Sequence, residues 1–232
     1  MRLSPAMNES LISGLLYQSE GDALDFKEKH YAISRDNVRK DGVPSTEVNA
    51  ELTKQKSEFL KDVLAMVNSW ARGPRYILLG VRENPPHPAE VVGLDEAQLP
   101  DDADLQEFIN SKTDAHVEFK YEKGLFNGAA LALITIPDQP RPRFAKKDFG
   151  SVKADTVYVR RGSATAIANP AEIAKMGAAS EKRQPATVQA LLQDESGRPL
   201  GQEQVSATVV EFPDDLPDFS YAKPGGCPEF CV

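Results

Sequence analysis

The 232-residue sequence contains few of the residues that build disulfide or zinc frameworks. Cys227 and Cys231 are its only cysteines, and both lie close to the end of the chain, so a disulfide scaffold and a four-cysteine metal site are excluded. The three histidines, His30, His87 and His116, are scattered without the spacing of metal ligands. A small redox or metal-binding tail around the two cysteines is the alternative that these counts leave open.

The sequence also lacks a long apolar run. A helix needs about 20 consecutive apolar residues to span a bilayer, and no segment approaches that length. The amino terminus, MRLSPAMNESLISGLL, does not have the layout of a signal peptide. Because 41% of the residues are hydrophobic, a sizeable core can form. We therefore expect a cytoplasmic protein with no membrane partner.

The net charge of −8 argues against a protein that coats nucleic acid through its overall field. The basic residues nevertheless gather in one part of the chain, at Arg141, Arg143, Lys146, Lys147, Lys153, Arg160 and Arg161. Two interpretations of this stretch stay open, a solvated loop and strand or a surface that contacts phosphate groups.

Hydrophobic periodicity indicates an alternation of helices and strands. Helices are predicted over residues 8–18, 47–71, 101–112 and 170–177, and strands over 23–30, 75–81, 91–94, 116–122, 129–137 and 155–165. The run RYILLGV at 75–81 is continuously apolar, which is typical of a strand buried on both faces. The fold class expected is α/β (α+β), a mixed β-sheet flanked by helices.

The composition changes near residue 179. We expect one domain over residues 8–178 and a C-terminal extension over 179–232. In the extension, two β-prone runs at 187–192 and 205–212 flank a turn rich in glycine, serine and proline. This β-prone arm is expected to form a hairpin or to pair with another subunit in a homo-oligomer.

The segment SEGDALDFKEKHYA places acids and a lysine on a short predicted strand. Side chains two positions apart in a strand share a face, so Asp25 and Lys27 are expected to face solvent together while Leu24 and Phe26 face inward. The alternative is a charged edge strand with surface salt bridges of little energetic value. A second acid-x-Lys triplet, Glu118 to Lys120, has no partner acid nearby in the sequence.

Three segments, in order, resemble the Schlafen AlbA-type domain family: SEGDALDFKE, FLKDVLAMVNSWARGPRYILLGVRE and VYVRRGSATAIANPAEI. The resemblance implies an α/β domain that binds nucleic acid, RNA more than DNA. In some members, three carboxylates form a metal-dependent endoribonuclease site that acts on structured RNA such as transfer RNA. Its setting would be stress or phage defence.

Carried over by motif, the resemblance implies a catalytic group of Glu20, Asp25, Lys27 and Glu83. The three acids would hold Mg²⁺ or Mn²⁺, which prefer oxygen ligands, and Lys27 would stabilise charge on the phosphate. Phosphate contacts are expected from the basic stretch, at Arg141, Arg143, Lys146, Lys147, Arg160, Arg161 and Ser163.

Two further functions are alternatives to the nuclease. One is a non-catalytic nucleic-acid-binding or regulatory module, such as a transcriptional regulator or a component of a defence complex. The other is ATP binding, but the sequence has no G-x-x-x-x-G-K-[ST] phosphate-binding loop.

Overall fold

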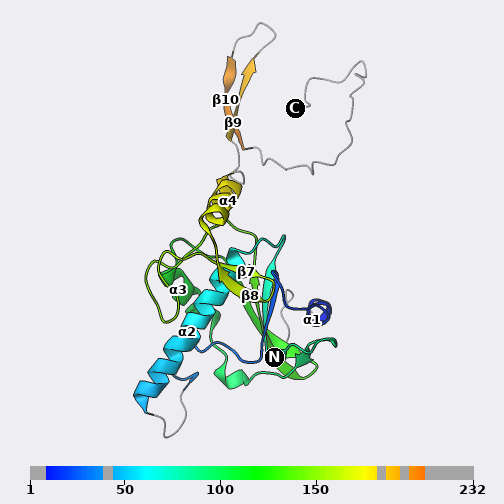
Figure 1. Cartoon of the computed structure of the whole chain (residues 1–232). Helices are drawn as coiled ribbons and strands as arrows, with labels where there is room; N and C mark the ends of the chain where they lie inside the picture. The colour runs from blue at the N-terminus through cyan, green and yellow to red at the C-terminus, as the bar shows by residue number, and fades with distance from the viewer. Residues whose placement is uncertain (1–8, 39–43, 182–186, 194–198, 207–232) are drawn as a thin grey trace. The chain divides into compact units, whose positions relative to one another are not determined.

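A computed structural model describes residues 9–38, 44–181, 187–193 and 199–206, shown as coloured ribbon in Figure 1. The chain divides into two units, Met1–Arg183 and Gln184–Val232. Cys227 and Cys231 lie outside the described residues, as does most of the predicted strand at 205–212. Among the described residues, no helix is long and apolar enough to cross a membrane.

A four-stranded sheet forms the centre of the first unit. Its strands lie in the order β1 (Leu24–Lys27), β2 (Arg75–Leu79), β6 (Ala129–Ile136) and β5 (Lys120–Phe126). β1 and β2 are parallel, whereas β2, β6 and β5 pair antiparallel. The mixed sheet expected from the sequence is therefore confirmed, and β1 is one of its edges.

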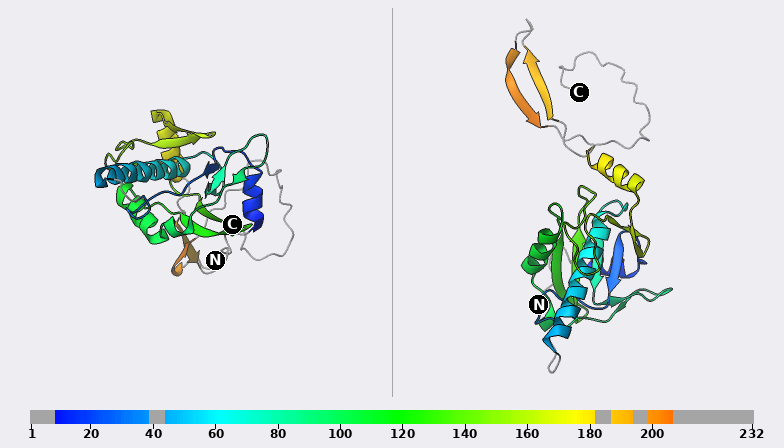
Figure 2. Two further views of the ribbon diagram at one scale, coloured as in Figure 1. Left: turned by 90° about the horizontal axis from the view of Figure 1, so that it is seen from below. Right: turned by 60° about the vertical axis from the view of Figure 1, so that its left-hand side comes forward.

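Both faces of this sheet are covered, because its central strands alternate between two apolar clusters. Ile77 and Leu79 of β2 pack in the cluster that includes α2 (Ser45–Val67), and Leu78 packs in the cluster that includes α1 (Glu9–Leu16). Figure 2 shows α2 and α1 on different sides of the strands. The expectation that 75–81 is buried on both faces is correct.

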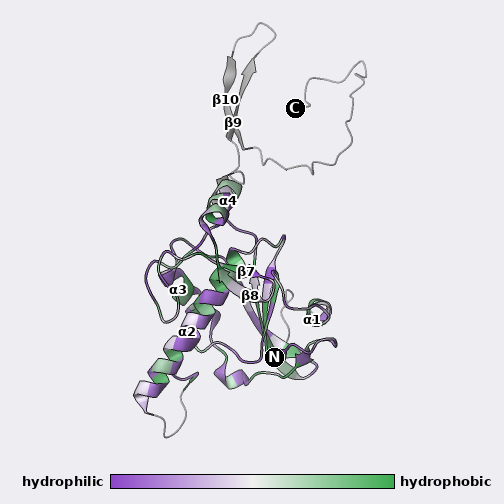
Figure 3. Cartoon of the chain, viewed as in Figure 1, coloured by the Kyte–Doolittle hydropathy of each residue, from purple (hydrophilic) through white to green (hydrophobic). Residues whose placement is uncertain are grey.

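The long helix α2 owes its position to an apolar stripe. Phe59, Leu60, Val63 and Leu64 are fully buried on one side, and in Figure 3 the helix alternates between hydrophilic and hydrophobic colours along its length. It ends at Val67 rather than at residue 71 as predicted.

The early end of α2 has a physical reason in the next residue. Asn68 is fully buried, and its Nδ2 donates to the carbonyl oxygens of Arg143 and Tyr158, both at 2.8 Å. The amide side chain therefore joins the end of α2 to two distant segments, and its Oδ1 also accepts from the Arg143 N–H at 2.8 Å.

Strand β5 begins at Lys120 instead of residue 116 as predicted. The residues before it pair with a side chain rather than with a strand: Glu118 N donates to Gln139 Oε1, and Gln139 Nε2 donates to the Glu118 carbonyl, both at 2.9 Å. The connection before β5 contains β3 (Val81–Arg82), β4 (Glu90–Val91), the short 3-10 helix η1 (Glu96–Gln98) and α3 (Asp102–Lys112).

The single strand predicted over residues 155–165 is a hairpin, β7 (Tyr158–Arg161) and β8 (Ala164–Ile167). Gly162 reverses the chain with a φ of +57°, which glycine adopts without steric cost. Helix α4 (Pro170–Glu181) follows, and Asn169 caps it, since Asn169 Oδ1 accepts from the Glu172 N–H at 3.0 Å.

The second unit contains an antiparallel pair, β9 (Thr187–Gln193) and β10 (Pro199–Ser206). Homo-oligomerisation through this arm stays a prediction.

Candidate functional site beside strand β1

Strand β1 directs Asp25 and Lys27 toward the α2 side of the sheet. They share a face, as their spacing predicts, but the expectation that both face solvent is wrong for Asp25, which is 2% exposed. The side of β1 that the sequence predicts to face solvent is covered by α2 and by Arg160 of β7, whose guanidinium contacts Asp25. The edge strand therefore carries a buried carboxylate rather than a surface charge.

Two cations neutralise Asp25. Arg160 Nη2 donates to Asp25 Oδ1 at 2.6 Å, and Arg160 is itself only 5% exposed. Lys27 Nζ lies 2.7 Å from Asp25 Oδ2, although without the angles of a hydrogen bond. The geometry is that of a buried ion pair reinforced by a second, partly exposed cation.

Asp62 of α2 extends this network toward solvent. Its Oδ2 accepts from Tyr31 Oη at 2.7 Å and lies 3.3 Å from Lys27 Nζ. Burial raises the pKa of Asp62, although Lys27 opposes the rise. Burial alone would lower the pKa of Lys27, but Asp62 and Asp25 together raise it. Lys27 is therefore held in its charged form between two carboxylates.

Glu20 and Glu83 lie next to each other beside β1. Glu20 Oε1 accepts from the Phe26 N–H at 2.8 Å, and Glu83 Oε1 accepts from the Glu20 N–H at 3.3 Å. Burial raises the pKa of Glu20, opposed by the Phe26 hydrogen bond and assisted by the charges of Asp25 and Glu83. Glu20 thus lies within electrostatic reach of both other predicted carboxylates, Asp25 and Glu83.

This arrangement does not fit a divalent metal ion. Magnesium and manganese need several oxygen ligands at short distance, yet both oxygens of Asp25 face a cation and one Glu20 oxygen is occupied by a backbone N–H. Within the described ranges, no group of three or more His, Cys, Asp or Glu side chains could hold a metal. The metal set of Glu20, Asp25 and Glu83 stays a prediction that this geometry does not support.

A cleft of about 580 Å³ opens next to this network. It is bounded by the residues that follow β1, by α2 and by Thr165 of β8. Its lining side chains are Lys27, Glu28, Lys29, His30, Tyr31, Glu51, Lys54, Gln55, Glu58, Lys61, Asp62 and Thr165. The charged network therefore forms one wall of the cleft, and Lys27 and Asp62 belong to both.

The predicted phosphate contacts separate into buried and exposed residues. Arg141 is buried: it donates to the Ser69 carbonyl, and its guanidinium lies 4.5 Å from the centre of the Trp70 ring. Arg160 is occupied by Asp25, and Arg143 is half-buried with its Nη1 donating to the Pro142 carbonyl at 3.3 Å. Arg141 and Arg160 are therefore buried side chains that stabilise the fold.

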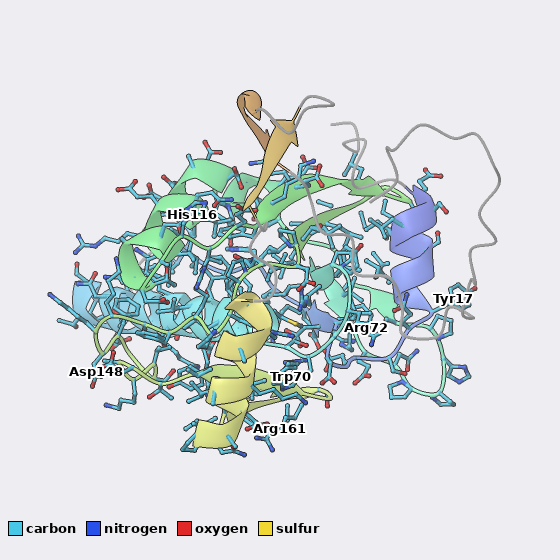
Figure 4. The ribbon with its side chains drawn as sticks, turned by 90° about the horizontal axis from the view of Figure 1, so that it is seen from above. Tyr17, Trp70, Arg72, His116, Asp148 and Arg161 are labelled. Atoms are coloured by element: carbon cyan, nitrogen blue, oxygen red, sulfur yellow. The ribbon has the colours of Figure 1, made fainter. Side chains whose placement is uncertain are left out.

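The remaining four are exposed. Arg161 pairs with Glu172 through Nη2 at 2.8 Å, next to α4, where Figure 4 labels it. Ser163 lies in the β7–β8 turn, and Lys146 and Lys147 lie in the loop after β6. Neither of these lysines forms an ion pair with any described residue.

Sequence reasoning missed Asp62, Tyr31 and Asp22. Asp22 Oδ1 accepts from the Gly162 N–H at 2.6 Å and so ties the β7–β8 turn to the segment before β1. A signal for Asp62 was available, because it lies three residues after Phe59 and therefore beside the buried stripe of α2. No such signal marks Tyr31 or Asp22, whose partners are distant in the sequence.

The buried Tyr31 hydroxyl should make the folded protein less stable at alkaline pH. Burial raises the pKa of Tyr31 well above 10.0, and Asp62 and Asp25 add to the rise. From about pH 10 the unfolded chain releases this proton while the folded chain keeps it, so the free energy of unfolding falls as pH rises. In Tyr31→Phe, the alkaline slope should be smaller by about 1.4 kcal/mol per pH unit, the value for one proton.

Urea unfolding of the wild type and Tyr31→Phe between pH 8 and pH 11 measures both slopes. Tyr17→Phe is the control, because Tyr17 is 79% exposed and projects from the end of α1 in Figure 4. Equal slopes for the wild type and Tyr31→Phe would show that Tyr31 ionises in the folded protein.

The chain belongs to the Schlafen, AlbA_2 family, whose model matches residues 20–169. The resemblance inferred from the three sequence segments is thereby confirmed. Membership makes this a nucleic-acid-related domain, and the match covers the β1 network, α2 and the β7–β8 hairpin. No curated protein is similar enough to count as a match.

Two solved structures are similar in part. A crystal structure of the DIP2311 protein from Corynebacterium diphtheriae is 18% identical with a TM-score of 0.45, and the similarity covers 77% of this chain and 30% of that chain. The N-terminal domain of a RecG-related protein from Nitrosomonas europaea is 16% identical with a TM-score of 0.35, covering 63% of this chain and 86% of that chain. These likenesses are too distant to indicate function.

Proposed function

We propose that this chain binds nucleic acid, RNA in preference to DNA, along the cleft beside Lys27 and the adjoining β7–β8 hairpin. The observation that carries the proposal is the convergence of four lysines on one opening: Lys27 and Lys29 from the end of β1, and Lys54 and Lys61 from α2. Lysines that meet from separate elements can follow a phosphate backbone, which supplies most of the affinity for nucleic acid.

The lysines of the cleft differ in how far carboxylates neutralise them. Lys27 is balanced by Asp25 and Asp62, whereas Lys29, Lys54 and Lys61 form no ion pair among the described residues. Of the lining carboxylates, Glu28 pairs with Arg82. Glu51 and Glu58 remain to offset the three lysines. The four lining lysines and four lining carboxylates balance, so binding depends on the lysines without an ion pair to a described residue, and it is expected to be moderate in strength and sensitive to salt.

The β7–β8 hairpin extends the surface. Thr165 of β8 lines the cleft, and the exposed Ser163 and Arg161 lie in the same hairpin. Arg161 is held by Glu172 near the surface, at 51% side-chain exposure. Exposed ion pairs of this kind are worth little, so a phosphate can replace the carboxylate at small cost.

The buried network contributes by fixing Lys27. Its ammonium group sits between Asp25 and Asp62 and faces the cleft from the wall, at 32% side-chain exposure. A cation that is already positioned loses little conformational freedom when a ligand arrives. Lys27 is therefore expected to orient the bound strand, and Lys54 and Lys61 to supply most of the charge.

The double variant Lys54→Gln/Lys61→Gln tests the proposal. Each phosphate contact contributes roughly 0.7 to 0.9 to the slope of log affinity against log salt, so the slope should fall by roughly 1.5. Fluorescence anisotropy with labelled transfer RNA and single-stranded DNA, between 50 and 200 mM salt (about the range where such slopes are measured), gives slope and preference together.

Lys120→Gln is the matched control, because Lys120 is exposed on β5 and pairs with Glu122. It should keep the wild-type slope. An unchanged slope in the double variant, or no binding by the wild type at low salt, would overturn the proposal.

A metal-dependent endoribonuclease is the second candidate function. In its favour, Glu20, Asp25 and Glu83 gather at one end of β1. Against it stand the ion pairs of Asp25, and no step through a metal follows from this arrangement. Cleavage of labelled transfer RNA with Mg²⁺ or Mn²⁺, compared between the wild type, Asp25→Asn and Glu83→Gln, decides between a nuclease and a non-catalytic module.

A further inference from the structure

A second cleft, of about 390 Å³, lies between α2 and α3 and is not shared with the cleft beside Lys27. It brings together lysines, phenylalanines and hydroxyl groups from four parts of the chain. Its lining residues of interest are Lys56, Lys112, Phe108, Phe149, Ser34 and Ser111.

Two ammonium groups converge in this cleft over aromatic rings. Lys56 Nζ lies 5.3 Å from the centre of the Phe108 ring, and Lys112 Nζ lies 4.7 Å from that of Phe149 and 6.0 Å from that of Phe108. The two rings are themselves 5.5 Å apart, edge to face. Neither lysine forms an ion pair with a described residue, and the faces of the rings attract their positive charge.

The two lysines repel each other. Burial lowers the pKa of Lys56, the positive charge of Lys112 lowers it further, and Asp104 opposes both effects. An anion bound between the ammonium groups would remove the repulsion and replace the water lost on burial. The cleft therefore has an electrostatic reason to hold a negative group.

The neighbouring loop adds further positive charge. Lys146 N donates to the Lys112 carbonyl at 2.8 Å, which places the exposed Lys146 and Lys147 next to the end of α3. Asp148, labelled in Figure 4 on the same loop, is already paired with Lys153 at 3.0 Å. Two acids of α3, Asp104 and Glu107, also line the cleft. Asp104 already offsets part of the charge of Lys56.

We propose that Lys56 and Lys112 form a phosphate subsite for the nucleic-acid backbone, separate from the cleft beside Lys27. This inference rests on the proposed function, because it assigns a second contact to the same ligand. Lys146 and Lys147 are exposed on the adjoining loop and form no ion pair with a described residue, so they would extend the positive surface beside the subsite.

Two measurements on the full chain test the subsite. The first is the salt dependence of transfer RNA binding by the wild type, Lys56→Gln/Lys112→Gln and the charge-retaining Lys56→Arg/Lys112→Arg. We expect the glutamine variant to lose roughly 1.5 in salt slope and the arginine variant to keep it. The second is the rise in melting temperature caused by inorganic pyrophosphate at constant ionic strength, which should occur in the wild type and be lost in the glutamine variant.

The outcomes separate this inference from the proposed function. Normal RNA binding with an unchanged slope in Lys56→Gln/Lys112→Gln, together with an unchanged pyrophosphate shift, would overturn the subsite and leave the cleft beside Lys27 intact. A pyrophosphate shift that depends on Lys56 and Lys112, in a chain that binds no RNA, would support a phosphate site and refute the proposed function. If the glutamine variant is destabilised and melts early, the arginine variant decides the outcome. The subsite is then overturned if the arginine variant also loses the salt slope and the pyrophosphate shift.

Discussion

Replacing Arg160 with alanine should lower the free energy of unfolding by about 3 to 5 kcal/mol. The variant would leave Asp25, which is 2% exposed, without its closest cation. Lys27 cannot take over fully, because its ammonium already lies between Asp25 and Asp62. An uncompensated charge in a buried site costs far more than the ion pair itself contributes.

Urea denaturation at neutral pH measures this loss. Arg161→Ala is the matched control on the same strand, since its exposed pair with Glu172 should contribute no more than about 1 kcal/mol. Adding Asp25→Asn to Arg160→Ala should recover part of the loss, because the buried group is then neutral. A loss below about 1 kcal/mol for Arg160→Ala would mean that Asp25 is solvated in the folded protein.

Replacing Phe59 with alanine is expected to cost a similar amount, about 3 to 5 kcal/mol, by opening a cavity in the core. Phe59 is fully buried on α2, and its ring centre lies 4.8 Å from that of Tyr31, 6.2 Å from that of Phe119 and 6.3 Å from that of Phe108. It therefore supports one wall of the cleft beside Lys27 and one wall of the phosphate subsite.

Phe59→Leu is the control, because a substitution that keeps most of the volume should cost less than about 1.5 kcal/mol. Thermal and urea unfolding of both variants measure the difference. Equal stability of the alanine variant and the wild type would show that neighbouring side chains close the space.

Much of the first unit could be predicted from the sequence, because its strongest signals are local. The apolar stripe of α2 and the continuous run of β2 specify a helix and a buried strand without knowledge of their partners. Errors occur where a distant side chain intervenes. Asn68 ends α2 by bonding to Arg143 and Tyr158, and Gln139 occupies the backbone of Glu118 before β5.

The candidate site was less accessible to sequence reasoning for the same reason. Alternation along β1 shows correctly that Asp25 and Lys27 share a face, but it does not show that α2 covers that face. The sequence predicts phosphate contacts for Arg160 and Arg141, yet their partners lie 135 and 72 residues away, at Asp25 and Ser69. No local pattern separates a buried arginine from an exposed one.

The ion pair between Arg160 and Asp25 also determines when β1 can become stable during synthesis. The two residues are separated by 135 positions, so Asp25 has only Lys27 as a cationic partner until Arg160 has been synthesised. Contacts this far apart in sequence carry a high loop-closure cost and form slowly. The α2-facing side of the N-terminal strand is therefore completed only when β7 forms, and a fragment ending before residue 160 would leave Asp25 without its guanidinium partner.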